Sequence, residues 1–282
     1  MKQLKTNPKY ILNRYLVIAG FFLLLASFFD LQISKIFYMR GTFYPNLIRF
    51  TGEMPMIILA GGLCIDIGLR YVDLIADKKK ELVNYPLFIL AILGFFLLSL
   101  ISSLGIPTYF QYQTAYSWIF IFIFYLAMSI LAKSLYKDID LKNLEKFFIF
   151  ILLSISISMV LLSFMKNTWS RSRFFYMHEQ NDYKDFSQWI IPQFRKDVED
   201  IYKSFPSGHT TSASLVLAWL YLTTKVPDKS YPKYLSSFFR FWPLLVAVGR
   251  ILDGAHYLSD VSFAIIMVTL IIKACHYLIY ER

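Results

Sequence analysis

The sequence contains little cysteine, glycine, proline or charge, and each scarcity excludes a class of protein. Its 282 residues include two cysteines, Cys64 and Cys275, so it is no disulfide scaffold and has no zinc-binding spacing. We expect both thiols to be buried, because free cysteine behaves as a small apolar residue. The 11 glycines and 10 prolines exclude collagen-like and low-complexity chains. Charged residues make up 17%, against roughly 25% in soluble domains, which argues against an ordinary soluble enzyme.

Apolar residues dominate the chain instead. They make up 57% of it, including 27 Phe and 20 Tyr, and the mean hydropathy is +0.50. Because a membrane-spanning helix needs about 20 mostly apolar residues, we predict an all-α, polytopic transmembrane helical bundle of about eight spans, forming a single domain over residues 1–282. The first span is followed by no small-residue cleavage site, so we expect it to be retained. The eight stretches are 12–29, 55–69, 87–104, 117–131, 147–165, 207–224, 238–249 and 261–279.

Basic residues are distributed unevenly between the loops. Most fall at the two ends of the chain and in the loops after the second, fourth and sixth stretches, which predicts cytoplasmic N- and C-termini in a cell (inner) membrane. The loop 166–206 lies on the outer side and still carries seven Lys and Arg residues. We attribute the net charge of +10 to this topology and to an anionic ligand of the outer loop, and we expect no nucleic acid partner.

Three polar clusters border the same outer face, and they contain two of the four histidines. The clusters are KNTWSRSR (166–173), PSGH (206–209) and RILDGAHYLSD (250–260). Lys166, Arg173 and Arg250 supply fixed positive charge, and the planar arginine fork suits phosphate oxygens. Ser207 and Gly208 open a helix, whose N–H groups and positive dipole end attract anions. The clusters therefore predict a phosphate site.

The histidines of these clusters suggest phosphoryl transfer. His256 and Asp260 are four residues apart and share a face if that stretch is helical. A carboxylate on one ring nitrogen leaves the other nitrogen free to attack phosphorus. His209 lies at the mouth of the anion-binding helix, where it can protonate a leaving oxygen. This pattern needs no metal ion and no cofactor, and we predict neither.

The three clusters resemble the signatures of the type 2 phosphatidic acid phosphatase (PAP2) superfamily, K-x6-RP, PSGH and SR-x5-H-x3-D. The resemblance covers about residues 147–279, and it departs from the pattern at Phe174, where Pro is usual, and at Gly249, where Ser is usual. It implies a six-span core, to which two spans would be added here. It implies that His256 forms a phosphohistidine, that Asp260 orients it and that His209 is the acid. The residues that would hold phosphate are Lys166, Arg173, Ser207, Gly208 and Arg250.

The resemblance implies a membrane lipid phosphatase that cleaves a phosphomonoester or pyrophosphate at the outer face of the bilayer. Phosphatidate, phosphatidylglycerophosphate and undecaprenyl pyrophosphate are typical substrates of such enzymes. Two alternatives remain: a lipid phosphotransferase that uses the same site with an alcohol acceptor, and a transporter that binds a lipid phosphate without cleaving it. A transporter would not need the His256–Asp260 pair together with His209.

Other polar and aromatic residues are given lesser roles. Arg171 is a candidate to support or replace Arg173, and Asp253 is expected to pair with a nearby arginine. His178 is interpreted as a loop residue and His276 as a residue of the interfacial belt. The acidic residues of the outer loop are expected to be solvated rather than to bind metal. The aromatic residues near the first cluster are interpreted either as a guide for an acyl or prenyl chain or as an interfacial belt; they are Trp169, Phe174, Phe175, Tyr176 and Trp189.

Overall fold

The computed structural model describes residues 7–76, 115–196, 198–224 and 233–282, and the described residues form helices and connecting loops. The chain divides into two compact units. The first comprises residues 1–53, 152–224 and 232–282, and the second comprises residues 54–151 and 225–231. Our expectation of one membrane domain stays a prediction. All residues of the three polar clusters belong to the first unit.

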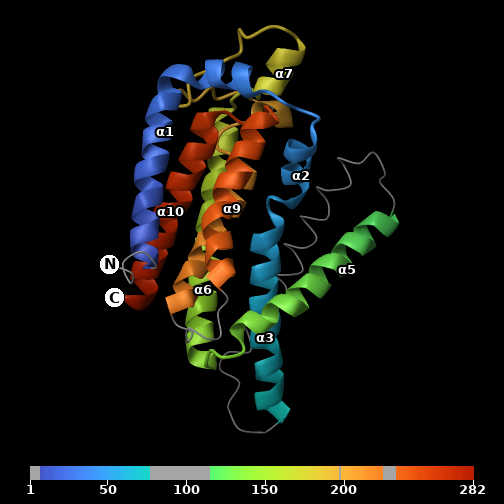
Figure 1. Ribbon diagram of the computed structural model, residues 1–282, viewed down its shortest axis with the longest axis vertical. Helices are drawn as coiled ribbons and strands as arrows, with labels where there is room; N and C mark the ends of the chain where they lie inside the picture. Colours follow the sequence, from blue (N-terminus) through green and yellow to red (C-terminus); the bar gives the residue numbers. More distant parts are fainter. Residues whose placement is uncertain (1–6, 77–114, 197, 225–232) are drawn as a thin grey trace. The chain divides into compact units, whose positions relative to one another are not determined.

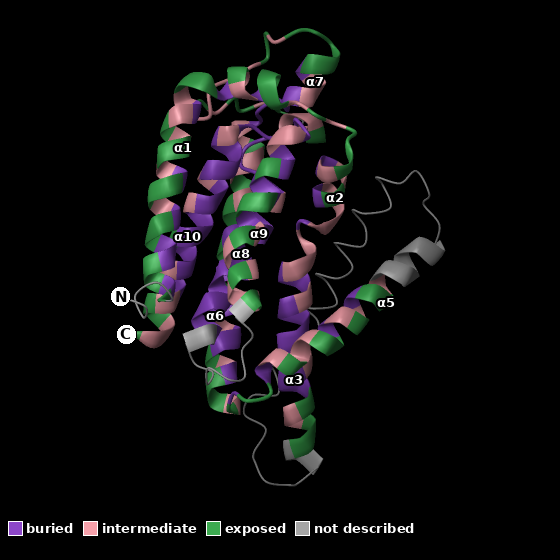
Figure 2. Cartoon of the chain, in the orientation of Figure 1, coloured by how far each residue is buried: buried purple, intermediate pink, exposed green. Residues whose placement is uncertain are grey.

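Within the described residues, five helical segments are long and apolar enough to cross a bilayer, which indicates a multi-pass membrane protein. Large apolar side chains cover the outer side of α1, whereas α10 is mostly buried (Figure 2). The five segments are Pro8–Phe37, Phe43–Asp73, Leu141–Glu179, Tyr234–Leu252 and Leu258–Tyr280.

The eight predicted spans compare with the structure as follows. Stretch 87–104 lies outside the described residues. Stretch 117–131 falls in α5 (Ala115–Ala132); the apolar helical segment there, Phe122–Tyr136, continues past the end of α5 and is too short to be counted among the candidate spans. Stretch 207–224 is helical but changes type, from α8 (Gly208–Leu215) to the 3₁₀ helix η5 (Val216–Thr224). The arrangement of eight spans therefore stays a prediction.

Long helices pack side by side in the first unit. α1 (Pro8–Phe37) runs along α10 (Leu258–Tyr280), and α8 packs against both α9 (Lys233–Leu252) and α10 (Figure 1). The short helix α2 (Phe43–Thr51) packs on α9. Lys9 and Glu281 form an ion pair of 2.9 Å, so the start of α1 and the end of α10 lie together. Both chain ends therefore lie at the same end of this unit.

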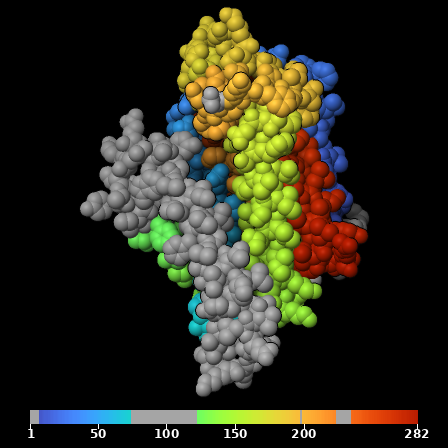
Figure 3. Space-filling model, turned by 180° about the vertical axis from the view of Figure 1, so that it is seen from behind, coloured from blue at the N-terminus to red at the C-terminus, as the bar shows by residue number. Residues whose placement is uncertain are grey.

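The opposite end of the first unit holds the loop that follows α6 (Leu141–Trp169). This loop carries α7 (Phe174–Glu179) and the 3₁₀ turn η4 (Asp200–Tyr202) before it enters α8. In the space-filling view the loop, yellow to orange, covers the end of the bundle above α6 and α10 (Figure 3). Trp169 and Trp189 both stack on Phe205, and Phe205 packs on Phe263 of α10. These rings fix the loop to the helices below it.

In the second unit, α3 (Met54–Ala76) packs against α5 and the 3₁₀ helix η3 (Lys133–Tyr136). Gly62 allows the close approach, because a Cβ atom there would lie 2.8 Å from the Cβ atom of Ala132. Arg70 donates to the carbonyl oxygens of Tyr136 and Ile139 at 2.8 and 2.5 Å. The Asp66 carboxylate lies 2.8 Å from Arg70 Nε.

Candidate active site

The three polar clusters meet where α6 ends and where α8 and α10 begin. The Nζ atom of Lys166 lies 3.3 Å from the position that a Cβ atom on Gly208 would occupy. The backbone N–H of Ser207 donates to the carbonyl oxygen of Asp260 at 3.2 Å. His256, between α9 and α10, contacts the backbone of Ser204. The structure therefore brings the clusters together, as the sequence predicts.

The second cluster forms the N-terminus of α8. Ser207 is the N-cap residue, and its hydroxyl accepts from the backbone N–H of Thr210 at 3.4 Å. Ser207 and Gly208 are buried beside Lys166. Because Gly208 has no side chain, the lysine ammonium reaches the helix end directly. A cation and the first N–H groups of a helix thus face the same space, which suits a phosphate.

His256 is held by a backbone carbonyl rather than by a carboxylate. Its Nδ1 atom lies 2.6 Å from the carbonyl oxygen of Ser204, and the residue is 1% exposed. A carbonyl oxygen only accepts, so Nδ1 carries the proton and donates it. The Nε2 atom of a neutral ring then has a free electron pair. This tautomer is the one that a nucleophilic histidine requires.

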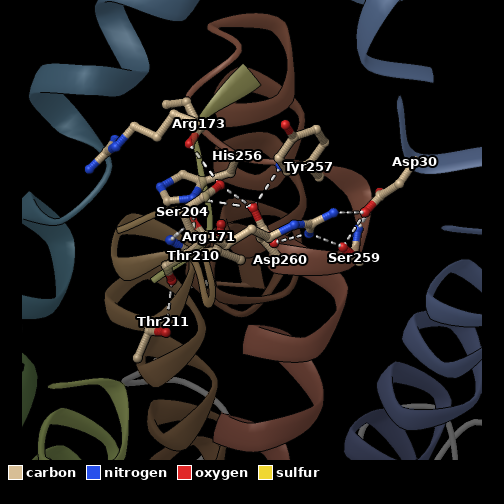
Figure 4. A network of polar contacts seen from close by, with 12 residues as sticks. Asp30, Arg171, Arg173, Ser204, Thr210, Thr211, His256, Tyr257, Ser259 and Asp260 are labelled. Carbon is tan, nitrogen blue, oxygen red and sulfur yellow. Dashed lines mark hydrogen bonds and ion pairs between the residues drawn. The ribbon is translucent and has the colours of Figure 1, made fainter. Parts of the chain in front are cut away.

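Asp260 does not hydrogen-bond to His256 directly but contacts Ser204, which does. Its Oδ2 atom lies 3.8 Å from Nδ1 of His256, beyond hydrogen-bond distance. The same oxygen accepts from the hydroxyl of Ser204 at 2.5 Å and from the backbone N–H of Tyr257 at 2.9 Å. The sequence predicts a direct His256–Asp260 bond. In the structure Ser204 contacts both side chains instead, His256 with its carbonyl oxygen and Asp260 with its hydroxyl (Figure 4).

Arg171 occupies a different place from the one expected. Its guanidinium is buried, with Nη1 2.6 Å from Asp260 and Nη2 2.8 Å from Asp30 of α1. It is therefore committed to two carboxylates and is not placed as a substitute for Arg173. Asp30 was not predicted from the sequence. The available signal was a lone carboxylate directly after the apolar stretch 12–29, within the length of a long membrane helix, where such residues are rare and point to a function.

Arg173 is paired with a residue of the loop between α6 and α8. It donates from Nε to the carbonyl oxygen of Asp200 and from Nη2 to the Asp200 carboxylate, both at 2.9 Å. The Asp200 side chain is 79% exposed, whereas that of Arg173 is 10% exposed. Asp200 was expected to be merely solvated. Its contact with Arg173 means that a phosphate would compete with this carboxylate for the guanidinium.

Asp253 lies between two arginines. Its Oδ2 atom is 3.1 Å from Nη1 of Arg250, and its Oδ1 atom is 2.5 Å from Nη2 of Arg49 in α2. The prediction that Asp253 pairs with an arginine is confirmed. Because Arg250 is 2% exposed and held by this carboxylate, its guanidinium has a defined position near the other cations.

His209 lies in the first turn of α8 and faces the end of α2. Its Nε2 atom is 3.1 Å from the carbonyl oxygen of Arg49, and its Nδ1 atom is 3.6 Å from the carboxylate of Glu53. Glu53 was not predicted either, since nothing in the sequence connects it with the second cluster. Among the described carboxylates, Glu53 is the one paired with this ring.

The electrostatics of the site favour a neutral nucleophile. Burial lowers the pKa of His256 well below its ordinary range. The positive charges of Arg250, Arg173 and Lys166 lower this pKa further. The ring therefore stays unprotonated at neutral pH, with its electron pair on Nε2. The three cations thus help to keep the imidazole neutral.

The comparison with known families agrees with this geometry. Residues 147–282 match the model of the PAP2 superfamily. This segment is a PAP2 superfamily domain. A search of curated proteins finds no match to the chain, and a search of solved structures finds none. The PAP2 superfamily consists generally of phosphatases, which fits the convergence of cations and histidines described above.

The two departures from the PAP2 pattern have a structural reason in this chain. A Cβ atom on Gly249 would lie 2.6–2.8 Å from three side-chain atoms of Ile48 in α2, so a serine there would force Ile48 to shift. Phe174 is fully buried and packs on Tyr38 and Tyr257, with ring centroids 5.4 and 6.3 Å apart. At both positions a residue from before the PAP2 domain packs against the residue that departs from the pattern. Ile48 lies against Gly249, and Tyr38 lies against Phe174.

The remaining polar and aromatic residues lie outside the candidate site. His178 is exposed and contacts the Tyr183 hydroxyl, and His276 stacks on Tyr221 and Tyr280. Phe174 is buried, whereas Trp169, Phe175, Tyr176 and Trp189 are half-buried, and the choice between a chain guide and an interfacial belt stays a prediction. Both cysteines are free and buried, as predicted.

Proposed function

We propose that this protein is a membrane phosphatase that hydrolyses a phosphomonoester or pyrophosphate on a lipid through a phosphohistidine intermediate. One observation carries the proposal. His256 donates its Nδ1 proton to the Ser204 carbonyl at 2.6 Å and lies beside basic residues of the first and third clusters, Lys166, Arg173 and Arg250. A buried, neutral imidazole with a free Nε2 electron pair beside a cationic pocket is suited to attack phosphorus.

The proposed reaction has two steps. In the first, Nε2 of His256 forms a bond to phosphorus while the bond from phosphorus to the lipid oxygen breaks. His209 donates a proton to that leaving oxygen. In the second step a water molecule attacks the phosphohistidine, the phosphorus–nitrogen bond breaks, and phosphate leaves with His256 regenerated. His209 accepts the proton of that water, so the protons balance over the cycle.

The cations would stabilise the charge that spreads over the phosphoryl oxygens during each step. Lys166 and the N-terminus of α8, with Ser207 and Gly208, would hold one side of the phosphate. Arg173 and Arg250 would hold the other side. Arg173 would first have to release Asp200, which links phosphate binding to a movement of the outer loop.

A lipid substrate is supported by the apolar surroundings of the site. A cavity of about 570 Å³ lies between α1, α9 and α10, and its walls are mostly apolar. It reaches Ile251, next to Arg250, and Leu258, two residues after His256. Its other end carries Arg14 and Arg240. An acyl or prenyl chain in this cavity would place its phosphate close to the cations.

The experiment that tests this proposal measures phosphate release by the purified protein in detergent with EDTA present. Phosphatidate, phosphatidylglycerophosphate and undecaprenyl pyrophosphate would be offered separately, together with an alcohol acceptor. We expect free phosphate from at least one lipid, with His256→Ala inactive. Phosphate found on the alcohol instead would identify a phosphotransferase, and tight lipid binding without any cleavage would identify a transporter.

A further inference from the structure

Asp30 is a carboxylate near the C-terminal end of α1, a helix long and apolar enough to cross a membrane. It is the single acidic residue of α1, and it is 1% exposed. Burying a carboxylate is costly unless it is paired and hydrogen-bonded. α1 lies before the PAP2 domain at residues 147–282, so the family pattern does not account for this residue.

The Asp30 carboxylate binds the N-terminus of α10. Its Oδ1 atom accepts from the backbone N–H of Ser259 at 3.0 Å, and its Oδ2 atom accepts from the Ser259 hydroxyl. Ser259 lies in the first turn of α10, whose N–H groups have no partner within the helix. A carboxylate at this position is also favoured by the helix dipole. Asp30 therefore fixes the start of α10 from a neighbouring helix.

Arg171 connects Asp30 with Asp260. Its Nη2 atom lies 2.8 Å from Asp30, and its Nη1 atom lies 2.6 Å from Asp260 and 2.7 Å from the Ser259 hydroxyl. The guanidinium also lies 4.0 Å from the centroid of the Tyr257 ring. One buried cation is thus shared by two buried carboxylates (Figure 4).

The contacts continue from Asp260 to the candidate nucleophile. Asp260 accepts from the Ser204 hydroxyl, and the Ser204 carbonyl accepts from Nδ1 of His256. A continuous series of hydrogen bonds and ion pairs therefore leads from α1 to the imidazole. The series runs through Asp30, Arg171, Asp260 and Ser204, and it includes none of the three proposed phosphate-binding cations, Lys166, Arg173 and Arg250.

We propose that Asp30 is a positioning residue for His256, acting through Arg171, Asp260 and Ser204; this rests on the proposed function of His256 as nucleophile. Asp30 pairs with Nη2 of Arg171, so Asp260 pairs with Nη1 alone and does so through its Oδ1 atom. The Oδ2 atom of Asp260 is then left to accept from Ser204 and Tyr257. Without the Asp30 charge, Arg171 is attracted to Asp260 alone. The Ser204 segment and the imidazole then lose their fixed geometry, and misplacement of a reacting group by about 1 Å costs roughly 100-fold in rate.

The test compares Asp30→Asn with wild type and with a matched control, Asp66→Asn. Asp66 is also a buried carboxylate paired with an arginine in a membrane helix, but it belongs to the second unit. Activity is expressed per folded protein, measured by size-exclusion chromatography and thermal unfolding in the same detergent. We expect Asp30→Asn to lower kcat by about 10- to 100-fold with KM changed less than about threefold. The control keeps the wild-type kcat.

A merely structural role gives a different result. Asp30→Asn would then lower the melting temperature, while kcat per folded protein stayed within about threefold of wild type, and this outcome overturns the proposal. If Asp30→Asn does not fold, Ser259→Ala decides the matter. This variant removes the hydroxyl shared by Asp30 and Arg171 and leaves every charge in place. A lower kcat with unchanged KM supports the proposal, and an unchanged kcat overturns it.

Binding of orthovanadate separates this proposal from the proposed function. Vanadate imitates the five-coordinate phosphoryl group, so its affinity reports the placement of His256 without turnover. If wild type hydrolyses no substrate, the proposed function fails. The positioning proposal then still stands if Asp30→Asn binds vanadate at least tenfold more weakly than wild type does. Equal affinity, or no vanadate binding by wild type, overturns it.

Discussion

The carbonyl oxygen of Ser204 lies 2.6 Å from Nδ1 of His256, and the hydroxyl of the same serine donates to Asp260. The Ser204 backbone therefore sets the tautomer of His256, the candidate nucleophile. The Ser204 side chain is held in turn by Asp260. Asp260, the carboxylate that the sequence assigns to His256, thus contacts this serine. Ser204 thus connects Asp260 with His256, although it belongs to none of the three polar clusters.

Ser204→Ala tests whether this connection supports His256. The variant keeps the carbonyl that contacts His256 but leaves Asp260 without one of its donors, so the carbonyl is less firmly placed. We expect kcat to fall about tenfold, which corresponds to the loss of one hydrogen bond to a charged group, with little change in KM. Steady-state kinetics of phosphate release measure both constants.

The control for Ser204→Ala is Ser134→Ala, which removes a hydroxyl that bonds the Leu131 carbonyl in the second unit. It should leave both constants unchanged. An unaltered kcat in Ser204→Ala would show that the serine hydroxyl does not support the nucleophile.

Asp200→Asn tests competition for Arg173. Asp200 occupies the guanidinium that is proposed to bind phosphate, and its side chain is largely exposed. Removing the charge should strengthen the binding of inorganic phosphate by about two- to fivefold, the range of an exposed ion pair. Isothermal titration calorimetry with phosphate measures the change.

Asp182→Asn serves as the comparison for Asp200→Asn. Asp182 is an acidic residue of the same loop, and it lies 3.4 Å from Lys184 instead of a candidate site residue. This variant should bind phosphate as wild type does. Weaker phosphate binding in Asp200→Asn would mean that Asp200 orders Arg173 for the ligand rather than competing with it.

Gly249→Ser tests why this chain departs from the PAP2 pattern. The added side chain would overlap Ile48 of α2, and such overpacking typically costs about 1–3 kcal/mol. We expect a lower melting temperature in detergent and recovery in the double variant with Ile48→Ala. Gly20→Ser in α1 is the control, since no atom lies within 4 Å of a Cβ there. Equal melting temperatures for wild type and Gly249→Ser would refute the steric explanation.

The pH dependence of stability tests the state of His256. Its pKa in the folded protein is well below the ordinary value of about 6.5. Below pH 6.5 the unfolded chain therefore binds a proton that the folded chain does not, so stability falls as the pH falls. Relative to His256→Asn, wild type should lose about 1.4 kcal/mol between neutral pH and pH 5.5.

Thermal unfolding of wild type and His256→Asn at several pH values measures this difference. Parallel melting curves for the two proteins over that interval would show that His256 titrates normally. In that case the surrounding cations do not keep the imidazole neutral.

The features that could be predicted from the sequence are those with local signatures. Apolar length predicted the long helices, and the PSGH cluster predicted a helix that begins at Ser207 and Gly208, where α8 begins. The convergence of Lys166, Ser207 and His256 followed from their common side in the predicted topology. Each of these features depends on neighbouring residues or on the order of spans.

The features that could not be predicted depend on distant contacts. Asp30 is 141 positions from Arg171, and no spacing rule connects the two. The Ser204 carbonyl is a backbone atom, so no residue type signals its role. The partner of Arg173 depends on how the loop between α6 and α8 folds. Gly249 is a departure from the family pattern whose reason appears only when Ile48 is placed beside it.

The most direct test of the central claim is to trap the phosphoenzyme. Wild type would be mixed with ³²P-labelled lipid phosphate in the presence of EDTA, quenched within the first turnover and digested. The account predicts an acid-labile, base-stable label on the peptide that contains His256, and no label in His256→Ala. Phosphate release by wild type without any labelled histidine, or equal turnover by His256→Ala, would contradict it.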